Sequence, residues 1–386
     1  FSKDGTYQDS GDPAAGSDAA FTTLSGSYAP CIQQSSASAV FTANFGQSSF
    51  STAAPTGFSA LSTANLPDPT IAKPSEYFST VLYAGDGSDG YEVTGVGFEP
   101  DMFWLKNRAA AENHYVFDSV RGVGTGAGKH ISPNDGTAEV SDATVKAITS
   151  DGFTVEATGA AINTGNHVVW SWLESTTPAF DIVSYDGTGS VKTESHGLGV
   201  VPDLMIIKNR EEADGWVIYH QSLGATKELR FSTAAISDNS AFFNDTAPTS
   251  SVFTVGTSHG VNGPSEAMIA YLWAEVEGYS KFGSYIGNAN SDGPFVWCGF
   301  KPAFLIVKQT SGTEGWIMFT STIDPYNVVG DYLFADSNAA EYDSAYVDFL
   351  SNGFKARING SGMNGSGTTH IFIAFAETPF KTANAR

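Results

Sequence analysis

The sequence predicts an all-β protein in which three tandem antiparallel β-sandwich repeats, jelly-roll-like and about 100 residues each, follow a partial β domain. Two observations support this prediction. Aromatic residues make up 13% of the 386-residue chain and charged residues only 16%, and 41 residues are glycine. This composition favours strands and tight turns over helices. In addition, one pattern of sequence blocks recurs three times along the chain.

Three prolines anchor the repeat, since Pro100, Pro202 and Pro302 are separated by 102 and then 100 residues. A glycine segment precedes each proline, and an apolar run that ends in a lysine follows it: "MFWLK", "LMIIK" and "FLIVK". Apolar runs of this length, bounded by glycine and proline, are typical of buried strands. A second strand is expected fourteen residues after each proline, at His114, Trp216 and Trp316.

Three further blocks complete a unit of five expected strands. They are an opening strand in "VLYAGDGSDG" (81–90), "IVSYDGTGS" (182–190) and "GSYIGNANSDG" (283–293), a fourth strand in "SDGFTV" (150–155), "SSVFTV" (250–255) and "SNGFKA" (351–356), and a closing strand in "HVVWSWLE" (167–174), "AMIAYLWAE" (267–275) and "HIFIAFAE" (370–377). The period exceeds that of ordinary solenoid repeats, so each unit is interpreted as a whole small domain. The predicted boundaries are 1–70 for the partial β domain and 71–178, 179–279 and 280–386 for the repeats.

The closing strands alternate between bulky and small residues. In the first copy Trp172, Trp170 and Val168 share one face, and Leu173 and Ser171 share the other. This alternation predicts that only the bulky face meets a deep core. No helix of ten or more residues is expected, although residues 142–150 could form one short helical turn.

A lysine and a glutamate recur at the ends of two apolar strands in every copy. A lysine buried beside a glutamate could act as a tuned base. An active site seldom occurs three times in one chain, however, whereas an ion pair that defines a fold recurs in every copy of that fold. The sequence therefore favours structural ion pairs between neighbouring strands, namely Lys106 with Glu174, Lys208 with Glu275, and Lys308 with Glu377.

No other pattern indicates a catalytic or cofactor-binding site. The seven histidines lack metal-ligand spacing, and no phosphate-binding loop or nucleophile elbow is present. Asp86 and Asp89 in "GDGSDG" (85–90) are weak candidates for calcium, but the loop is more typical of a hairpin turn. Cys31 and Cys298 are expected to be inert, partly buried thiols. We therefore expect no cofactor, no structural metal and no catalytic residue.

Three aligned rings, those of His114, Trp216 and Trp316, are candidates for binding. Exposed aromatic rings can stack on sugars, but aromatic residues at strand starts more often pack in a core or at a sheet edge. The sequence leaves both interpretations open.

The charge of the chain limits its partners. The formal net charge is −22, and no basic stripe is present, which argues against binding to nucleic acid. No apolar run approaches the roughly 18 residues of a membrane span, so insertion into a membrane is not expected.

Two resemblances bear on function. In residues 1–70 the elements "SKDGT", "LSGSYAPC", "FTANFGQSSF" and "PTGFSAL" resemble the C-terminal strands of a SPRY domain, a concanavalin-like jelly roll, which implies a longer polypeptide before Phe1. Residues 79–386 resemble a module of predicted virion proteins of marine tailed bacteriophages, in the "GF-P-D" strands that end in "K-N-R" and in the terminal "FAETPFKTANAR". The third copy departs from this pattern at Ala303, Gln309 and Thr310, so any role of the aspartate and arginine is in doubt there.

The phage resemblance implies a non-enzymatic structural protein at the virion surface, such as the distal part of a tail fibre, a spike or another appendage. Its expected partners are copies of itself, with a trimer as one option, other virion proteins and host-surface glycans. A capsid decoration or head-fibre protein that binds no receptor is the main alternative. A polysaccharide-degrading enzyme and a bacterial adhesin are the remaining ones.

Overall fold

The computed structural model describes residues 2–3, 6–7, 48, 60, 65–124, 128–142, 144–157 and 160–383. The chain divides into two compact units, Phe1–Asp68 and Pro69–Arg386. In the first unit, β1 (Ser2–Lys3) and β2 (Thr6–Tyr7) form an antiparallel pair. The rest of the SPRY-like pattern expected over 1–70, and Cys31 with it, lies almost wholly outside the described residues.

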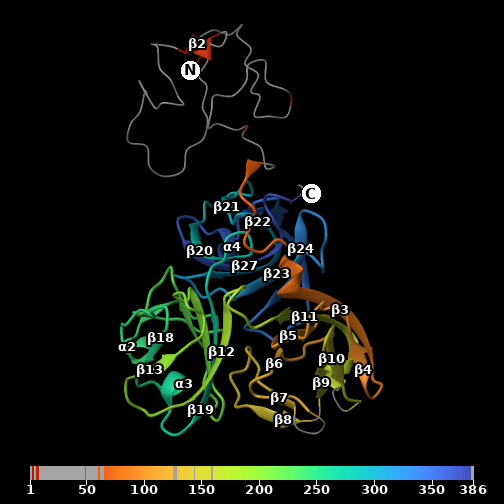
Figure 1. The fold of residues 1–386 in the computed structure, drawn as a ribbon, viewed down its shortest axis with the longest axis vertical. Coiled ribbons are helices and arrows are strands. Elements are labelled where there is room, and N and C mark those ends of the chain that lie inside the picture. The colour runs from red at the N-terminus through yellow and green to blue at the C-terminus, as the bar shows by residue number, and fades with distance from the viewer. Residues whose placement is uncertain are drawn as a thin grey trace. The chain divides into compact units, whose positions relative to one another are not determined.

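The second unit is all-β, as predicted, and its described strand pairs are antiparallel (Figure 1). Its helices are single turns: η3 (Pro74–Glu76), α1 (Ala160–Asn163), α2 (Ser240–Phe243), α3 (His259–Asn262) and α4 (Ser361–Asn364). The helical turn expected over 142–150 is wrong, because β9 (Val145–Thr149) lies within this stretch. Among the described residues, no helix has the length and apolarity of a membrane span.

The five expected strands are present in all three segments. In 71–178 the strands are β3 (Phe78–Asp86), β4 (Tyr91–Val93), β5 (Met102–Asn107), β6 (Tyr115–Asp118), β7 (Gly128–His130), β8 (Val140–Asp142), β9, β10 (Gly152–Val155) and β11 (Thr164–Trp172). In 179–279 they are β12 (Phe180–Asp186), β13 (Lys192–Ser195), β14 (Leu204–Asn209), β15 (Val217–His220), β16 (Lys227–Glu228), β17 (Ser237–Asp238), β18 (Val252–Val255) and β19 (Ala267–Trp273). In 280–386 they are β20 (Ser280–Ile286), β21 (Phe295–Trp297), β22 (Phe300–Gln309), β23 (Ile317–Thr320), β24 (Val329–Phe334), β25 (Tyr342–Leu350), β26 (Gly353–Ala356) and β27 (Thr369–Pro379).

The same sheet order occurs in each segment. The opening strand pairs with the closing strand, which pairs with the lysine strand and then with the strand after it: β3-β11-β5-β6, β12-β19-β14-β15 and β20-β27-β22-β23. In the third segment the sheet continues through β24, β25 and β26 to β21, so that eight strands form one sheet. In the other two segments the additional strands form separate small sheets, β4-β10-β9 and β7-β8 in the first and β13-β18 and β16-β17 in the second.

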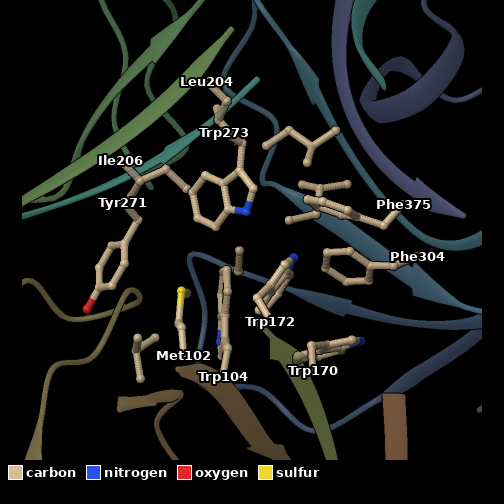
Figure 2. Close-up of a cluster of buried hydrophobic side chains, with 14 of the residues drawn as sticks. Met102, Trp104, Trp170, Trp172, Leu204, Ile206, Tyr271, Trp273, Phe304 and Phe375 are labelled. Carbon is tan, nitrogen blue, oxygen red and sulfur yellow. The ribbon is translucent and has the colours of Figure 1, made fainter. Parts of the chain in front are cut away.

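A single hydrophobic core joins the three segments. The bulky residues of the closing strands, including Trp170, Tyr271 and Phe375, belong to one buried cluster with residues of the lysine strands (Figure 2). The opposite faces of the same sheets are buried too, against a separate cluster within each segment. The four shared strands of each segment therefore have two buried faces, whereas the sequence predicted a deep core on only one.

The segments predicted as separate domains thus form one compact unit, Pro69–Arg386, around a shared centre. Backbone hydrogen bonds close the arrangement into a ring. Glu139 N donates to Arg210 O (2.7 Å), joining the first segment to the second. Ile236 N donates to Thr310 O (2.9 Å) between the second and third, and Glu341 N donates to Arg108 O (2.9 Å) between the third and first.

Candidate binding site

The repeated lysines lie at the ends of their strands and are fully buried. Each amine donates to two main-chain carbonyls, one of which belongs to the turn that follows the strand. The acceptors are Asn107 and Ala110 for Lys106, Asn209 and Glu212 for Lys208, and Thr233 and Glu314 for Lys308. Burial lowers the pKa of Lys106 and of Lys208 to about 8 and also lowers the pKa of Lys308. Each lysine thus stabilises a turn that would otherwise bury its carbonyl oxygens without donors.

The predicted lysine–glutamate ion pairs are wrong. The strands are neighbours, as expected, but they are antiparallel, and Lys106 lies opposite Val168 while Glu174 follows the far end of β11. The glutamates have other partners. Glu275 pairs with Lys281 (2.5 Å), Glu377 pairs with Lys301 (2.5 Å), and Glu174 accepts a hydrogen bond from Ile182 N (3.1 Å).

The three candidate sugar-stacking rings are buried, so the packing interpretation is correct and the binding interpretation is wrong. Each ring reaches a neighbouring segment. Trp216 Nε1 donates to Ser132 O (2.9 Å), and Trp316 Nε1 donates to Arg230 O (2.8 Å). His114 accepts at Nδ1 from Trp104 Nε1 (2.8 Å), which places the ring proton on Nε2, 3.0 Å from Phe334 O. Burial lowers the pKa of His114 to about 3, so the neutral ring persists.

The junctions between segments explain why the third copy lacks the arginine of the repeated pattern. Arg108 forms a bidentate ion pair with Glu341, and Arg210 forms one with Glu139. The third junction has neither charge, because Thr310 replaces the arginine and Ile236 replaces the glutamate. Both partners change together, so no buried charge is left unpaired there.

The other candidates have local roles. Asp86 accepts hydrogen bonds from the backbone and hydroxyl of Ser88 within the hairpin turn, and Asp89 pairs with Lys146 (2.6 Å). Over the described ranges, no group of three or more His, Cys, Asp or Glu side chains is arranged to hold a metal ion. Cys298 is buried, and burial raises the pKa of its thiol, in agreement with an inert role.

A pair of exposed aromatic side chains on β21 forms a candidate binding surface. Phe295 and Trp297 are 46% and 51% exposed, whereas Val296 between them is buried, so the two rings share the outer face of the strand. An ideal Cβ at position 299 would lie 3.1 Å from the indole, so Gly299 leaves room for the ring of Trp297. We call Phe295 and Trp297 the aromatic edge.

Two ion pairs flank the aromatic edge. Lys281 Nζ lies 5.6 Å from the centre of the Trp297 ring, at cation–π distance, and is 2.5 Å from Glu275. Lys355 lies directly opposite Phe295 in the sheet and pairs with the exposed Asp292 (2.8 Å). Two flat apolar rings between charged hydrogen-bonding groups can bind a ligand that has both apolar and hydroxylated faces.

The sequence analysis missed the aromatic edge because it followed the features that the copies share. The register aligns Val296 with Val93 and Glu194, so Trp297 takes the place of Thr94 and Ser195. Phe295 likewise takes the place of Glu92 and Thr193. An aromatic pair present in only one of three copies, at positions that are otherwise polar, is the signal that could have found it.

A known family model matches most of the unit Pro69–Arg386. Residues 73–379 match the model of a family described as a domain of unknown function, DUF7483. The chain belongs to the DUF7483 family. The match covers strands from all three segments, in agreement with the single compact unit of the structure. No curated protein matches the chain.

Within the DUF7483 unit, the junction between the first and second segments gathers carboxyl groups around Glu174. At this position of the opening strand, Asp181 takes the place that Lys281 has in the third segment. Asp101 is also close, since its Oδ2 accepts a hydrogen bond from Glu174 N (2.7 Å). Burial, together with Asp181 and Asp101, raises the pKa of Glu174 to about 7.

We expect the Glu174→Gln variant to be more stable than the native protein at pH 8, by about 1 kcal/mol after allowance for solvent screening at this half-buried site. The raised pKa means that the fold favours the protonated carboxyl. This stabilisation is fully present below about pH 4.5 and is lost as the pH rises through about 7. The neutral amide of the variant would mimic the protonated carboxyl at every pH.

Urea unfolding at pH 5 and pH 8 measures this effect. Glu275→Gln is the matched control, because it removes a glutamate that is already paired with Lys281 and should give no gain at pH 8. A Glu174→Gln variant whose stability changes with pH as the native protein's does would contradict the interpretation.

Proposed function

We propose that this DUF7483 protein is a non-enzymatic structural protein of a virion surface, in the distal part of a tail fibre, a spike or a similar appendage, and that it attaches to host-surface glycans. The observation that carries the attachment is the aromatic edge, two half-exposed rings between two ion pairs. The virion setting rests on the resemblance of residues 79–386 to modules of phage proteins. Other virion proteins and further copies of the chain are the proposed partners.

The contacts of the buried lysines and of His114 support a non-enzymatic role. The repeated lysines are bound by backbone carbonyls, and His114 is held neutral between a tryptophan and a carbonyl. These groups stabilise turns and junctions and are not accessible to a substrate. The chemistry on the described surface therefore suits binding better than catalysis.

We also infer that 71–178, 179–279 and 280–386 are copies of one β-sandwich unit. The shared sheet order and the buried cluster within each segment support this. In such an array the shared strands keep the fold, while individual strands and loops are free to acquire binding residues. The aromatic edge is an example, because the equivalent positions in the other two copies are polar.

Adsorption of the purified full chain to host cells and to immobilised host polysaccharide tests the function. We expect Phe295→Ala combined with Trp297→Ala to weaken binding at least tenfold, equivalent to about 1.4 kcal/mol. Tyr326→Ala is the matched control, because Tyr326 is a highly exposed aromatic residue outside the edge. Equal binding by the native protein and the double variant would overturn the role of the edge, and release of reducing sugar would overturn the non-enzymatic role.

A further inference from the structure

A pocket lies where the first and third segments meet. This pocket has a volume of about 340 Å³, at the lower end of the range for small-molecule sites, roughly 300–1,000 Å³. It lies between the start of β3 and the ends of β23 and β27, and its wall also includes Ala303 of β22. The aromatic edge, by contrast, lies beside Lys281 and Glu275 at the junction between the second and third segments.

The pocket occurs where small residues replace larger ones of the other junctions. Thr80 of the opening strand pairs with Trp170 of the closing strand. The equivalent residue of the opening strand is Ile182 in the second segment, where it pairs with Tyr271. In the third segment it is Phe282, which pairs with Ile373. Ser79 likewise takes the place of Asp181 and Lys281, and Ala303 takes the place of Asp101 and Asp203, each of which follows the anchoring proline. Three reductions in side-chain size at one junction account for the space.

Hydroxyl groups dominate the polar lining of the pocket. They belong to Ser75, Ser79, Ser321 and Thr322. Hydroxyls both donate and accept hydrogen bonds, so this wall is complementary to the hydroxyls of a ligand. The remaining wall includes Phe78, Ala303 and Ala376, which offer an apolar surface to the C–H face of a ring.

The charges at the pocket are balanced. Glu377 Oε1 lies 2.5 Å from Lys301 Nζ, and its Oε2 accepts a hydrogen bond from Ser321 Oγ (2.9 Å). The carboxylate is neutralised by a cation of its own segment, so the pocket favours a neutral ligand over an anion. Glu377 also fixes the orientation of the Ser321 hydroxyl.

Thr80 lines the pocket, but its hydroxyl oxygen faces away from the open space. Its Oγ1 is buried and has no hydrogen-bond partner within the described part of the chain, and the same is true of Nε1 of Trp170 on the adjacent strand. A buried polar atom without a partner is unfavourable. Isoleucine and phenylalanine are used at the equivalent positions, so the fold does not require a hydroxyl there.

We propose that this pocket binds one neutral polyhydroxylated ring, a hexose unit of a glycan. The wall lined by serine and threonine hydroxyls binds the hydroxyls of the ring, and the apolar wall packs against the ring carbons. This site is separate from the aromatic edge and does not depend on the adsorption role proposed for it.

Ligand-observed NMR on the full chain tests this proposal with free neutral hexoses, glycerol and a hexuronic acid as probes. We expect saturable binding of at least one neutral hexose and at least tenfold weaker binding of glycerol and of the uronic acid. Thr80→Ile and Ala303→Asp, which introduce side chains found at the equivalent positions, should each weaken hexose binding at least tenfold. Thr193→Ile is the matched control, since it makes the same change on an exposed strand and should leave binding intact.

Of three results that would overturn the proposal, two concern hexose binding. One is the absence of saturable binding of any neutral hexose to the native chain. The other is undiminished binding in both pocket variants, with folding verified by circular dichroism. If glycerol binds as well as the hexoses, the pocket recognises a small polyol and the assignment to a glycan ring is wrong. Because the adsorption experiment uses the aromatic edge, it can succeed or fail independently of this one.

Discussion

Replacement of Trp216 by alanine is expected to lower the free energy of unfolding of the unit 69–386 by about 3–5 kcal/mol. The indole is fully buried, stacks on Tyr271 with ring centres 6.2 Å apart, and contacts Phe231 at 6.1 Å. Its Nε1 also donates to Ser132 O in the neighbouring segment. The variant therefore loses apolar packing and leaves a carbonyl at a junction without its donor.

Because the central core is shared, the loss should affect all three segments together. Urea unfolding monitored by tryptophan fluorescence and by backbone circular dichroism should give one coincident transition at a lower midpoint. Trp297→Ala is the matched control. It removes the same side chain from an exposed site and should cost less than about 1 kcal/mol. If the second segment alone unfolded in the Trp216 variant, the segments would be independent domains.

The strands were predictable because their signal is local. Glycine and proline mark the turns, apolar runs mark the buried strands, and three copies of each block confirm one another. The sequence thus located β5 and β14 after their prolines, the part of β22 that follows Pro302, and the closing strands β11, β19 and β27. The structure agrees with these assignments to within a few residues.

The association of the segments was not predictable by the same argument. A period of about 100 residues is long enough for a separate domain, and nothing local to Trp216 or Trp316 shows that a neighbouring segment covers it. The same is true of His114, whose partner Phe334 is 220 residues away. The exposure of a side chain depends on how the segments associate. The sequence therefore allowed these three rings to be surface groups, although each of them forms a hydrogen bond to a neighbouring segment.

The error in the ion pairs has a geometric cause. Lys208 lies near the end of β14 and Glu275 follows the end of β19, and both strands were correctly expected to be neighbours. In an antiparallel pair, however, the C-terminal ends of two strands lie at opposite ends of the sheet. A lysine near the C-terminal end of one strand and a glutamate just after the C-terminal end of its neighbour are therefore too far apart to form an ion pair. The registers show this directly, since Lys208 pairs with Ile269 and not with the end of β19.

Replacement of Asp118 by asparagine is expected to lower stability by about 3–5 kcal/mol, as much as the loss of Trp216. Asp118 is fully buried, and its Oδ2 lies 2.5 Å from Arg121 Nε and accepts a hydrogen bond from the Tyr271 hydroxyl (2.6 Å). Burial raises the pKa of Tyr271, so its hydroxyl remains a donor. Asparagine keeps the shape of the side chain but leaves the guanidinium of Arg121 buried without its closest counter-charge.

Glu139 offsets only part of this loss, because it lies 3.5 Å from Arg121 and already forms a bidentate pair with Arg210. Two variants separate the buried charge from the hydrogen bond. Tyr271→Phe removes the hydroxyl that donates to Asp118, keeps both charges, and should cost about 1 kcal/mol. Replacing both charges, by Asp118→Leu with Arg121→Met, should cost less than Asp118→Asn alone, because no unpaired ion remains. Urea midpoints that rank the double variant below Asp118→Asn would show that packing around Asp118, and not charge, stabilises this junction.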